Sequence, residues 1–194
     1  MSIDIAHLVE RIRVLETELE AELARRRAEL RVGLERGRIV FEQEVLRRHR
    51  EMKTRLWRYL AGARPLVVLT APVIYAGIVP FMLLDLFVSL YQAICFPAYG
   101  IEKVRRAGYL IFDRGFLAYL NAAEKLNCAY CSYANGVIAY AREAGARTEK
   151  HWCPIKHARR AIGMHQLYRE FTDYGDAEAY RKLSTPPKPA AGAP

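Results

Sequence analysis

Residues 65–97 read PLVVLTAPVIYAGIVPFMLLDLFVSLYQAICFP, and this stretch decides the fold. Its only charged residue is Asp85, and the uncharged run 65–84 reaches the length of about 20 residues that a membrane-spanning helix requires. Apolar runs of this length are rare in soluble domains, so the sequence predicts a membrane-embedded helical segment over residues 63–98.

The apolar segment is interrupted near its middle by Pro72, Gly77 and Pro80. It is compatible with a single tilted, kinked span, or with a hairpin of two short helices over 66–78 and 81–95, because proline removes a helical hydrogen bond. Both flanks are basic, and basic flanks prefer the cytoplasmic side of a membrane. We therefore predict the hairpin, with both ends on one side.

The flanks carry the cations and aromatic rings that meet lipid headgroups. The predicted membrane-surface residues are Arg55, Trp57, Arg58, Tyr59, Arg64, Lys103, Arg105 and Arg106. The net charge of +9 favours the anionic inner leaflet as a partner. No nucleic-acid-binding motif occurs, so we expect no nucleic acid partner. Asp85 is the intramembrane polar residue, either a relay, a subunit contact or a group near the surface.

Residues 1–62 are predicted to form a long amphipathic helix. Apolar residues step by three and four, as in a coiled coil, at Ile5, Leu8, Ile12, Leu15 and Leu19. The stripe weakens at Gly33 and Gly37, which are poor helix formers, so the helix over 3–60 is either continuous or interrupted there. Residues 3–34 either bind a protein partner or a second copy, or pack on the rest of the chain.

The clearest chemical motif is Cys128-x-x-Cys131 followed by Cys153-x-x-x-His157, a C-x2-C-x21-C-x3-H spacing. We expect a helix over 101–126, the first two thiols at the start of a helix over 134–144, and a helix over 155–168. Cys153 and His157 then share one helix face. Three thiols and one imidazole are a standard structural zinc set, which predicts a small helical metal-binding module over 99–183.

Other readings of the thiols remain open. An iron–sulfur cluster takes cysteine ligands, and the last of these cysteines is often followed by proline, as in Cys153-Pro154. Cys95 is an alternative ligand for such a cluster. The pair Cys128 and Cys131 can also cycle between dithiol and disulfide. Finally, the cysteines can be core residues without any site.

Around Asn127-Cys128-x-Tyr130-Cys131 and Trp152-Cys153-Pro154-Ile155-Lys156-His157 the sequence resembles bacterial membrane-associated proteins of unknown function. The resemblance covers mainly residues 90–160. It implies a family built around these thiols and brings no activity or cofactor.

No catalytic residues are identified, because G-x-S-x-G, P-loop, G-x-G-x-x-G and H-E-x-x-H motifs are missing from the sequence. We expect an all-α, non-enzymatic, membrane-anchored zinc protein, an accessory or assembly subunit of a membrane complex. The alternatives are an electron-transfer protein and a coiled-coil membrane scaffold without metal. No secretory signal opens the chain, so we place it at the bacterial inner membrane with both termini and the thiols facing the cytoplasm. Residues 184–194 are predicted to be a disordered tail.

Overall fold

The computed structural model describes residues 5–29, 32–35, 38–41, 43–159 and 161–184. The described chain is mostly helical, as the sequence predicts, and one short β-hairpin is the exception. It divides into two compact units. Unit 1 comprises residues 1–64 and 113–128, and unit 2 comprises residues 65–112 and 129–194.

In unit 1, five shorter elements occupy the described residues of the predicted long helix. Helix α1 (Ile5–Glu29) is followed by the antiparallel strands β1 (Val32–Glu35) and β2 (Arg38–Phe41), then by α2 (Gln43–Glu51) and α3 (Leu56–Ala61). The predicted helix over 3–60 is therefore interrupted, which the sequence allowed, and the strands at the interruption were not predicted. Gly33 lies in β1, and glycine is a poor helix former, which explains a break at this position.

The apolar seam of α1 is present but uncovered. Leu8, Ile12, Leu15 and Leu19 are between 38% and 60% exposed. Glutamate and arginine on the other faces form ion pairs with each other along the helix, such as Glu22 with Arg26. The helical prediction is confirmed for this segment, and a coiled-coil partner stays a prediction.

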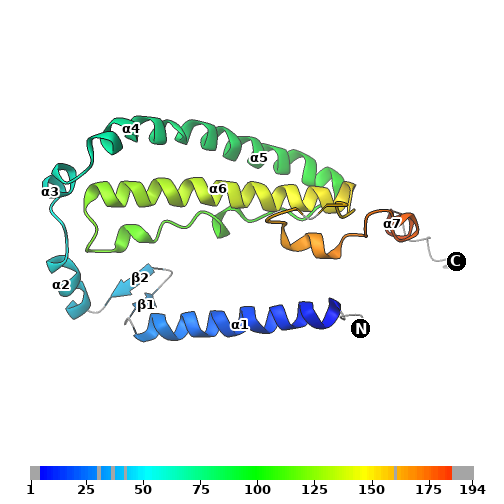
Figure 1. The fold of residues 1–194 in the computed structure, drawn as a ribbon, viewed down its shortest axis with the longest axis horizontal. Coiled ribbons are helices and arrows are strands. Elements are labelled where there is room, and N and C mark those ends of the chain that lie inside the picture. Colours follow the sequence, from blue (N-terminus) through cyan, green and yellow to red (C-terminus); the bar gives the residue numbers. More distant parts are fainter. Residues whose placement is uncertain (1–4, 30–31, 36–37, 42, 160, 185–194) are drawn as a thin grey trace. The chain divides into compact units, whose positions relative to one another are not determined.

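Unit 2 begins with α4 (Pro65–Ala76) and α5 (Ile78–Tyr99), which follow each other without reversing direction (Figure 1). Gly77 between them has helical backbone angles, with φ −58° and ψ −15°. Pro80 lies in the first turn of α5, where a backbone N–H has no helical acceptor in any case. The predicted hairpin is therefore wrong. Together α4 and α5 form, among the described residues, one helix long and apolar enough to cross a membrane, Pro65–Tyr99.

Helix α6 (Ala122–Trp152) lies beside this long helix and runs in the same direction (Figure 1). Residues later in α6 contact residues later in the long helix, which shows the common direction. The pairs are Tyr130 with Ile74, Tyr133 with Asp85, Tyr140 with Gln92, and Trp152 with Tyr99. A buried core lies between them and the segment that follows α5, formed by Val88, Phe96, Val104, Tyr140 and Ala144.

The segment between α5 and α6 is irregular, so the predicted helix over 101–126 is wrong. It contains two short 3-10 turns, η1 (Arg106–Gly108) and η2 (Arg114–Phe116). Within unit 2 its backbone approaches α6 at Gly136, where an added Cβ would lie 2.6 Å from the Tyr109 carbonyl oxygen. Such a close approach is possible because glycine has no side chain.

The start of α6, within unit 1, is fixed by a reciprocal cap. The Glu124 N–H donates to Asn121 Oδ1 at 3.1 Å, and the Asn121 N–H donates to Glu124 Oε2 at 2.8 Å. This is the geometry of a capping box. Helix α6 then continues through Gly145, so its predicted end at this glycine is wrong.

After α6 the chain folds back irregularly instead of forming the predicted helix over 155–168. Ile155 pairs with Thr172 as an isolated bridge, and the 3-10 turn η3 (Gln166–Glu170) and helix α7 (Ala177–Ser184) follow. Apart from Ser184, the predicted tail over 184–194 lies outside the described residues.

Candidate functional site

The thiol pair Cys128 and Cys131 lies inside α6, more than one turn beyond its first residue, Ala122. The predicted position of this pair at the start of a helix is therefore wrong. Cys128 is half-buried and Cys131 is exposed, and all four cysteines are free thiols.

The second half of the predicted metal site lies at the other end of α6. Cys153 follows the last helical residue, Trp152. With a rise of about 1.5 Å per residue, the unbroken helix from Cys131 to Trp152 is about 31 Å long. Zinc–sulfur bonds are about 2.3 Å long, so Cys131 and Cys153 of one chain cannot hold the same ion.

The local clamp predicted from Cys153 and His157 is also missing, because these residues are not helical. The His157 N–H donates to the Tyr168 hydroxyl at 2.5 Å, and the two rings stack at 6.1 Å. Among the residues that the structure describes, no three histidine, cysteine, aspartate or glutamate side chains are grouped to hold a metal. The predicted four-ligand site is therefore not formed within the chain.

Cys95 does not restore that site. It lies on α5 one turn before Tyr99, whose ring contacts Trp152 at 5.2 Å between centroids. Cys95 thus accompanies the end of α6 and is remote from Cys131, so it cannot complete a site with the thiol pair.

The structure instead brings together an unpredicted polar cluster between α5 and α6. At its centre is Asp85, which is only 7% exposed. Arg106 binds the carboxylate with two nitrogens, Nε to Oδ1 at 2.8 Å and Nη2 to Oδ2 at 2.5 Å. The Tyr133 hydroxyl donates to Oδ2 at 3.0 Å. The acid at the predicted membrane depth therefore faces protein partners.

Gln92 extends the polar cluster two turns along α5. Its side-chain amide exchanges two hydrogen bonds with the backbone of Val104, donating to the carbonyl at 3.2 Å and accepting from the N–H at 2.9 Å. It also donates to the Tyr140 hydroxyl at 2.5 Å. This fully used amide holds the irregular segment after α5 against both helices.

Sequence reasoning missed Ser89 and Gln92 as members of the cluster. Together with Asp85 they stand at i, i+4 and i+7, which places them on one helix face. Three polar residues on one face of an apolar segment indicate a covered face, and that signal was available in the sequence. Their partners Tyr133 and Tyr140 are 48 residues away and gave no such signal.

Tyr109, Tyr133 and Arg106 have raised pKa values. Burial raises the pKa of Tyr133, and its hydrogen bond to Asp85 raises it further. Burial likewise raises the pKa of Tyr109, with a smaller contribution from Glu143. The hydrogen bond to Asp85 raises the pKa of Arg106. These shifts favour neutral side chains at Tyr109 and Tyr133 and a charged guanidinium at Arg106.

The side of α4 and α5 away from α6 forms a second surface, which we call the outer face. Its residues are 53–75% exposed: Leu66, Leu69, Val73, Val79, Met82, Leu83, Leu86, Phe87, Leu90 and Ile94. An uncovered apolar surface of this extent on a soluble protein marks an interaction with a membrane or another protein.

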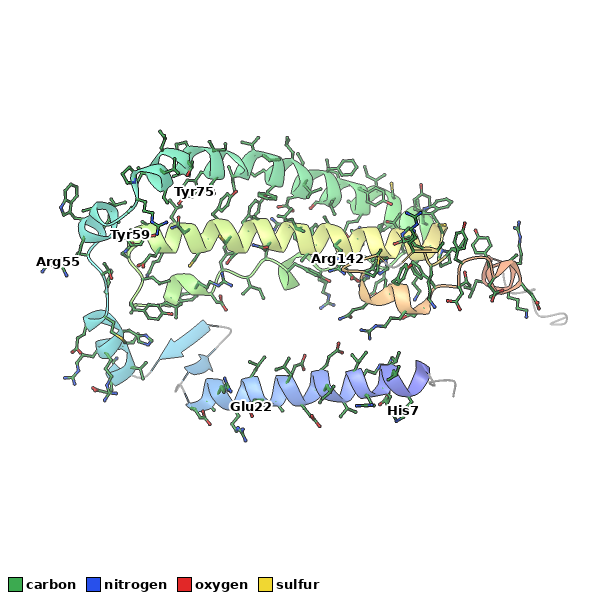
Figure 2. The ribbon with its side chains drawn as sticks, viewed as in Figure 1. His7, Glu22, Arg55, Tyr59, Tyr75 and Arg142 are labelled. Carbon is green, nitrogen blue, oxygen red and sulfur yellow. The ribbon has the colours of Figure 1, made fainter. Side chains whose placement is uncertain are left out.

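The predicted membrane-surface residues divide between the two units. Unit 1 contains Arg55, Trp57, Arg58, Tyr59 and Arg64. Figure 2 shows Arg55 at the start of α3 and Tyr59 within α3. Lys103, Arg105 and Arg106 follow α5 in unit 2. Lys103 and Arg105 are exposed, whereas Arg106 is bound to Asp85 and serves as an internal partner.

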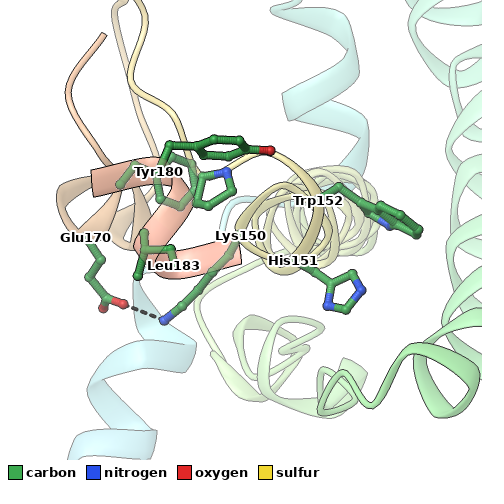
Figure 3. A pocket seen from close by; sticks show the side chains of 8 residues that line it. Lys150, His151, Trp152, Glu170, Tyr180 and Leu183 are labelled. Atoms are coloured by element: carbon green, nitrogen blue, oxygen red, sulfur yellow. Dashed lines mark hydrogen bonds and ion pairs between the residues drawn. The ribbon is translucent and has the colours of Figure 1, made fainter. Parts of the chain in front are cut away.

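A pocket of about 400 Å³ lies beside the end of α6 in unit 2. Figure 3 shows Lys150 of α6 paired with Glu170, and Tyr180 and Leu183 of α7 on its wall. Its histidine, His151, stacks against Tyr99 and contacts Trp152. The pocket thus combines aromatic and aliphatic walls with an ion pair, without grouping several metal ligands.

No protein-family model matches the chain, and searches of curated proteins and of solved structures find no match either. The function is therefore inferred from the residues themselves.

Proposed function

We propose that this protein is a membrane-attached accessory protein that uses α4 and α5 as its apolar anchor. The observation that carries the proposal is the outer face, whose ten apolar side chains are more than half exposed, as are Val67, Val68 and Ile74 on α4. Removing apolar surface from water is favourable by about 25 cal/mol per Å², so burying this surface in lipid favours attachment.

The polar cluster supports the same proposal. A charged residue in an apolar segment disfavours membrane attachment unless it is paired. Asp85 is paired with Arg106 and accepts a hydrogen bond from Tyr133, so the segment presents no free acid to lipid. The apolar side chains can then enter the membrane while the charges remain within unit 2.

The proposal is tested by fractionating cells and washing the membranes with alkaline carbonate. Wild-type protein is expected to stay in the membrane pellet. A variant with Leu69→Lys, Leu83→Lys and Leu90→Lys should be released at least tenfold more, because each lysine places a charge where lipid is expected.

A matched variant separates attachment from general loss of hydrophobic surface. Leu8→Lys, Leu15→Lys and Leu19→Lys replace three exposed leucines of α1 with the same three charges. This variant should stay with the membrane. Release of both triple variants to the same extent, or of wild-type protein in the wash, would refute the anchor.

A metal remains part of the proposal only at the thiol pair of α6. Cys128 and Cys131 stand at i and i+3 on the helix and face one side, which supplies two of the four ligands that structural zinc takes. The other ligands would come from another molecule. Zinc content measured after purification without chelator should fall in Cys131→Ser and stay unchanged in Cys153→Ser.

A further inference from the structure

We propose that α4 and α5 lie along the membrane surface within one leaflet, and do not cross the bilayer. This inference rests on the proposed membrane attachment and specifies how the outer face meets lipid. Three observations support the inference: the length of the outer face, the difference between the apolar and polar sides of α5, and the charged groups packed beside α5.

The outer face is longer than a bilayer is thick. From Leu66 to Ile94 there are 28 helical steps, or about 42 Å at 1.5 Å per residue. The hydrocarbon core is about 30 Å thick, so a perpendicular helix would leave about 12 Å of exposed apolar side chains in water. A tilt of about 45° would be needed to cover them, beyond the usual range of about 0–40°. A helix parallel to the surface covers the whole stripe.

Helix α5 is apolar on one side and polar on the other. Leu83, Leu86 and Leu90 are exposed on the outer face, whereas Asp85 and Gln92 are buried against α6. The polar side of α5 is covered by α6, so only its apolar side is available to lipid. A helix that crosses the membrane alone needs apolar residues on all sides.

The groups beside α5 do not belong in hydrocarbon. The irregular segment 101–112 runs back alongside α5 from its end to the level of Asp85, where Arg106 binds. It carries the exposed cations Lys103 and Arg105. Irregular backbone exposed to lipid does not occur in the hydrocarbon region, because its polar groups lack partners there. A crossing α5 would carry this segment into the core of the bilayer.

Helix α6 adds further charges on the side away from the outer face. Figure 2 shows Arg142 on the side of α6 that points away from α5, where its Nη2 donates to the Gly163 carbonyl. Arg147 pairs with Glu143 on the same helix. With α5 lying on the membrane, these charges remain in water.

The charges also identify the lipid. Arg64 directly precedes α4, and Lys103 and Arg105 follow α5, so cations stand at both ends of the apolar stripe. Basic residues near a surface attract anionic lipid by about 1 kcal/mol each. The occupant of the outer face is therefore a bilayer with anionic headgroups, and a second copy of the chain is the competing occupant.

Depth measurements on the full chain test this inference. Spin labels are placed at Leu69→Cys, Phe87→Cys and Ile94→Cys after the four natural cysteines are changed to serine. The protein is bound to vesicles of phosphatidylcholine and phosphatidylglycerol, and label depth is measured from collisions with oxygen and with a nickel complex. All three labels should lie at the same shallow depth, and a label at the exposed Ala139 of α6 should stay in water.

The other outcomes overturn the inference in recognisable ways. Labels at Leu69 and Ile94 near opposite surfaces would establish a crossing helix while leaving membrane attachment intact. Labels that broaden one another between chains would establish a second copy as the occupant. Wild-type protein that does not float with the vesicles would refute the attachment itself.

A second measurement keeps all natural cysteines. Reporter fusions at the N-terminus and after Pro194 of the otherwise unchanged chain should report the same side of the membrane. Reporters on opposite sides would refute the surface orientation.

Discussion

The two faces of α5 differ in what they contact and therefore in what they do. The outer face is apolar and exposed, at 58% for Leu86 and 71% for Ile94. The inner face carries a carboxylate and an amide, buried to 7% and 8% exposure and bound to partners from later in the chain. The inner face holds unit 2 together, and the outer face is exposed, as the proposed membrane contact requires. Substitutions on one face should therefore leave the property of the other unchanged.

The largest expected effect on stability comes from Arg106→Leu on the inner side. It leaves the Asp85 carboxylate buried with the Tyr133 hydroxyl and without a cation. Removing one partner of a buried pair costs about 3–5 kcal/mol, and the half-exposed Arg106 side chain reduces this to about 2–3 kcal/mol. Denaturant unfolding in detergent measures it. Arg105→Leu, at the exposed neighbour, is the control and should change stability by less than about 0.5 kcal/mol.

Next in size is Gly136→Ala on α6. The new Cβ would lie 2.6 Å from the Tyr109 carbonyl oxygen, and because that oxygen is backbone the segment after α5 must move. Overpacking of this kind costs about 1–3 kcal/mol.

Gly145→Ala in the same helix is the matched control. An added Cβ there has open space, so the better helix propensity of alanine should stabilise the protein by up to about 1 kcal/mol. Equal thermal shifts in the two variants would contradict the packing described at Gly136.

A smaller effect is expected at alkaline pH. The pKa values of Tyr109 and Tyr133 are raised from 10.0, so the folded state holds these protons more tightly than the unfolded state. Their contribution to stability is complete below pH 10 and is lost as the pH rises through the raised pKa values. Tyr133→Phe should lose less stability over that range than wild type. An identical alkaline slope in unfolding experiments would show that Tyr133 does not contribute.

The smallest expected effect on folding is on the outer face. Leu90→Ser replaces a side chain that is 53% exposed, so unfolding in detergent should change by about 0.5 kcal/mol or less. The same variant should bind phosphatidylcholine–phosphatidylglycerol vesicles more weakly in flotation. A large loss of stability in detergent would mean that this face packs within the protein.

Those parts of the fold that depend on local composition were predictable from the sequence. The apolar run over 65–97 gave a helix, and the seam of α1 gave a helix. The path of the chain at Gly77 was not predictable, because a glycine and a nearby proline are compatible with a reversal of direction as well as with a continuing helix. The structure keeps Gly77 helical and places Pro80 in the first turn of α5.

The hairpin prediction also failed for an electrostatic reason. It treated every cation near the segment as free to meet phosphate. Arg106 is instead bound to Asp85, 21 residues earlier, and such a pairing depends on tertiary contacts that sequence spacing does not reveal.

The thiol site failed because the distance between two motifs depends on the conformation between them. Twenty-one residues can form a loop that returns Cys153 to Cys131, or a helix that separates them by about 30 Å. Gly145 favoured a break in the helix, yet α6 passes through it. The spacing of the cysteines alone did not distinguish these cases.

The contacts between α5 and α6 form only after both helices have been synthesised. The ribosome completes α5 well before α6, and Tyr133 follows Asp85 by 48 residues. At a synthesis rate of about 5–20 residues per second, Tyr133 is made about 2–10 s after Asp85, and Arg106 is made about 1–4 s after Asp85. During this interval the apolar side of α5 is already complete and its polar side is still uncovered. The order of synthesis therefore leaves the apolar side of α5 exposed before the rest of unit 2 can fold against its polar side.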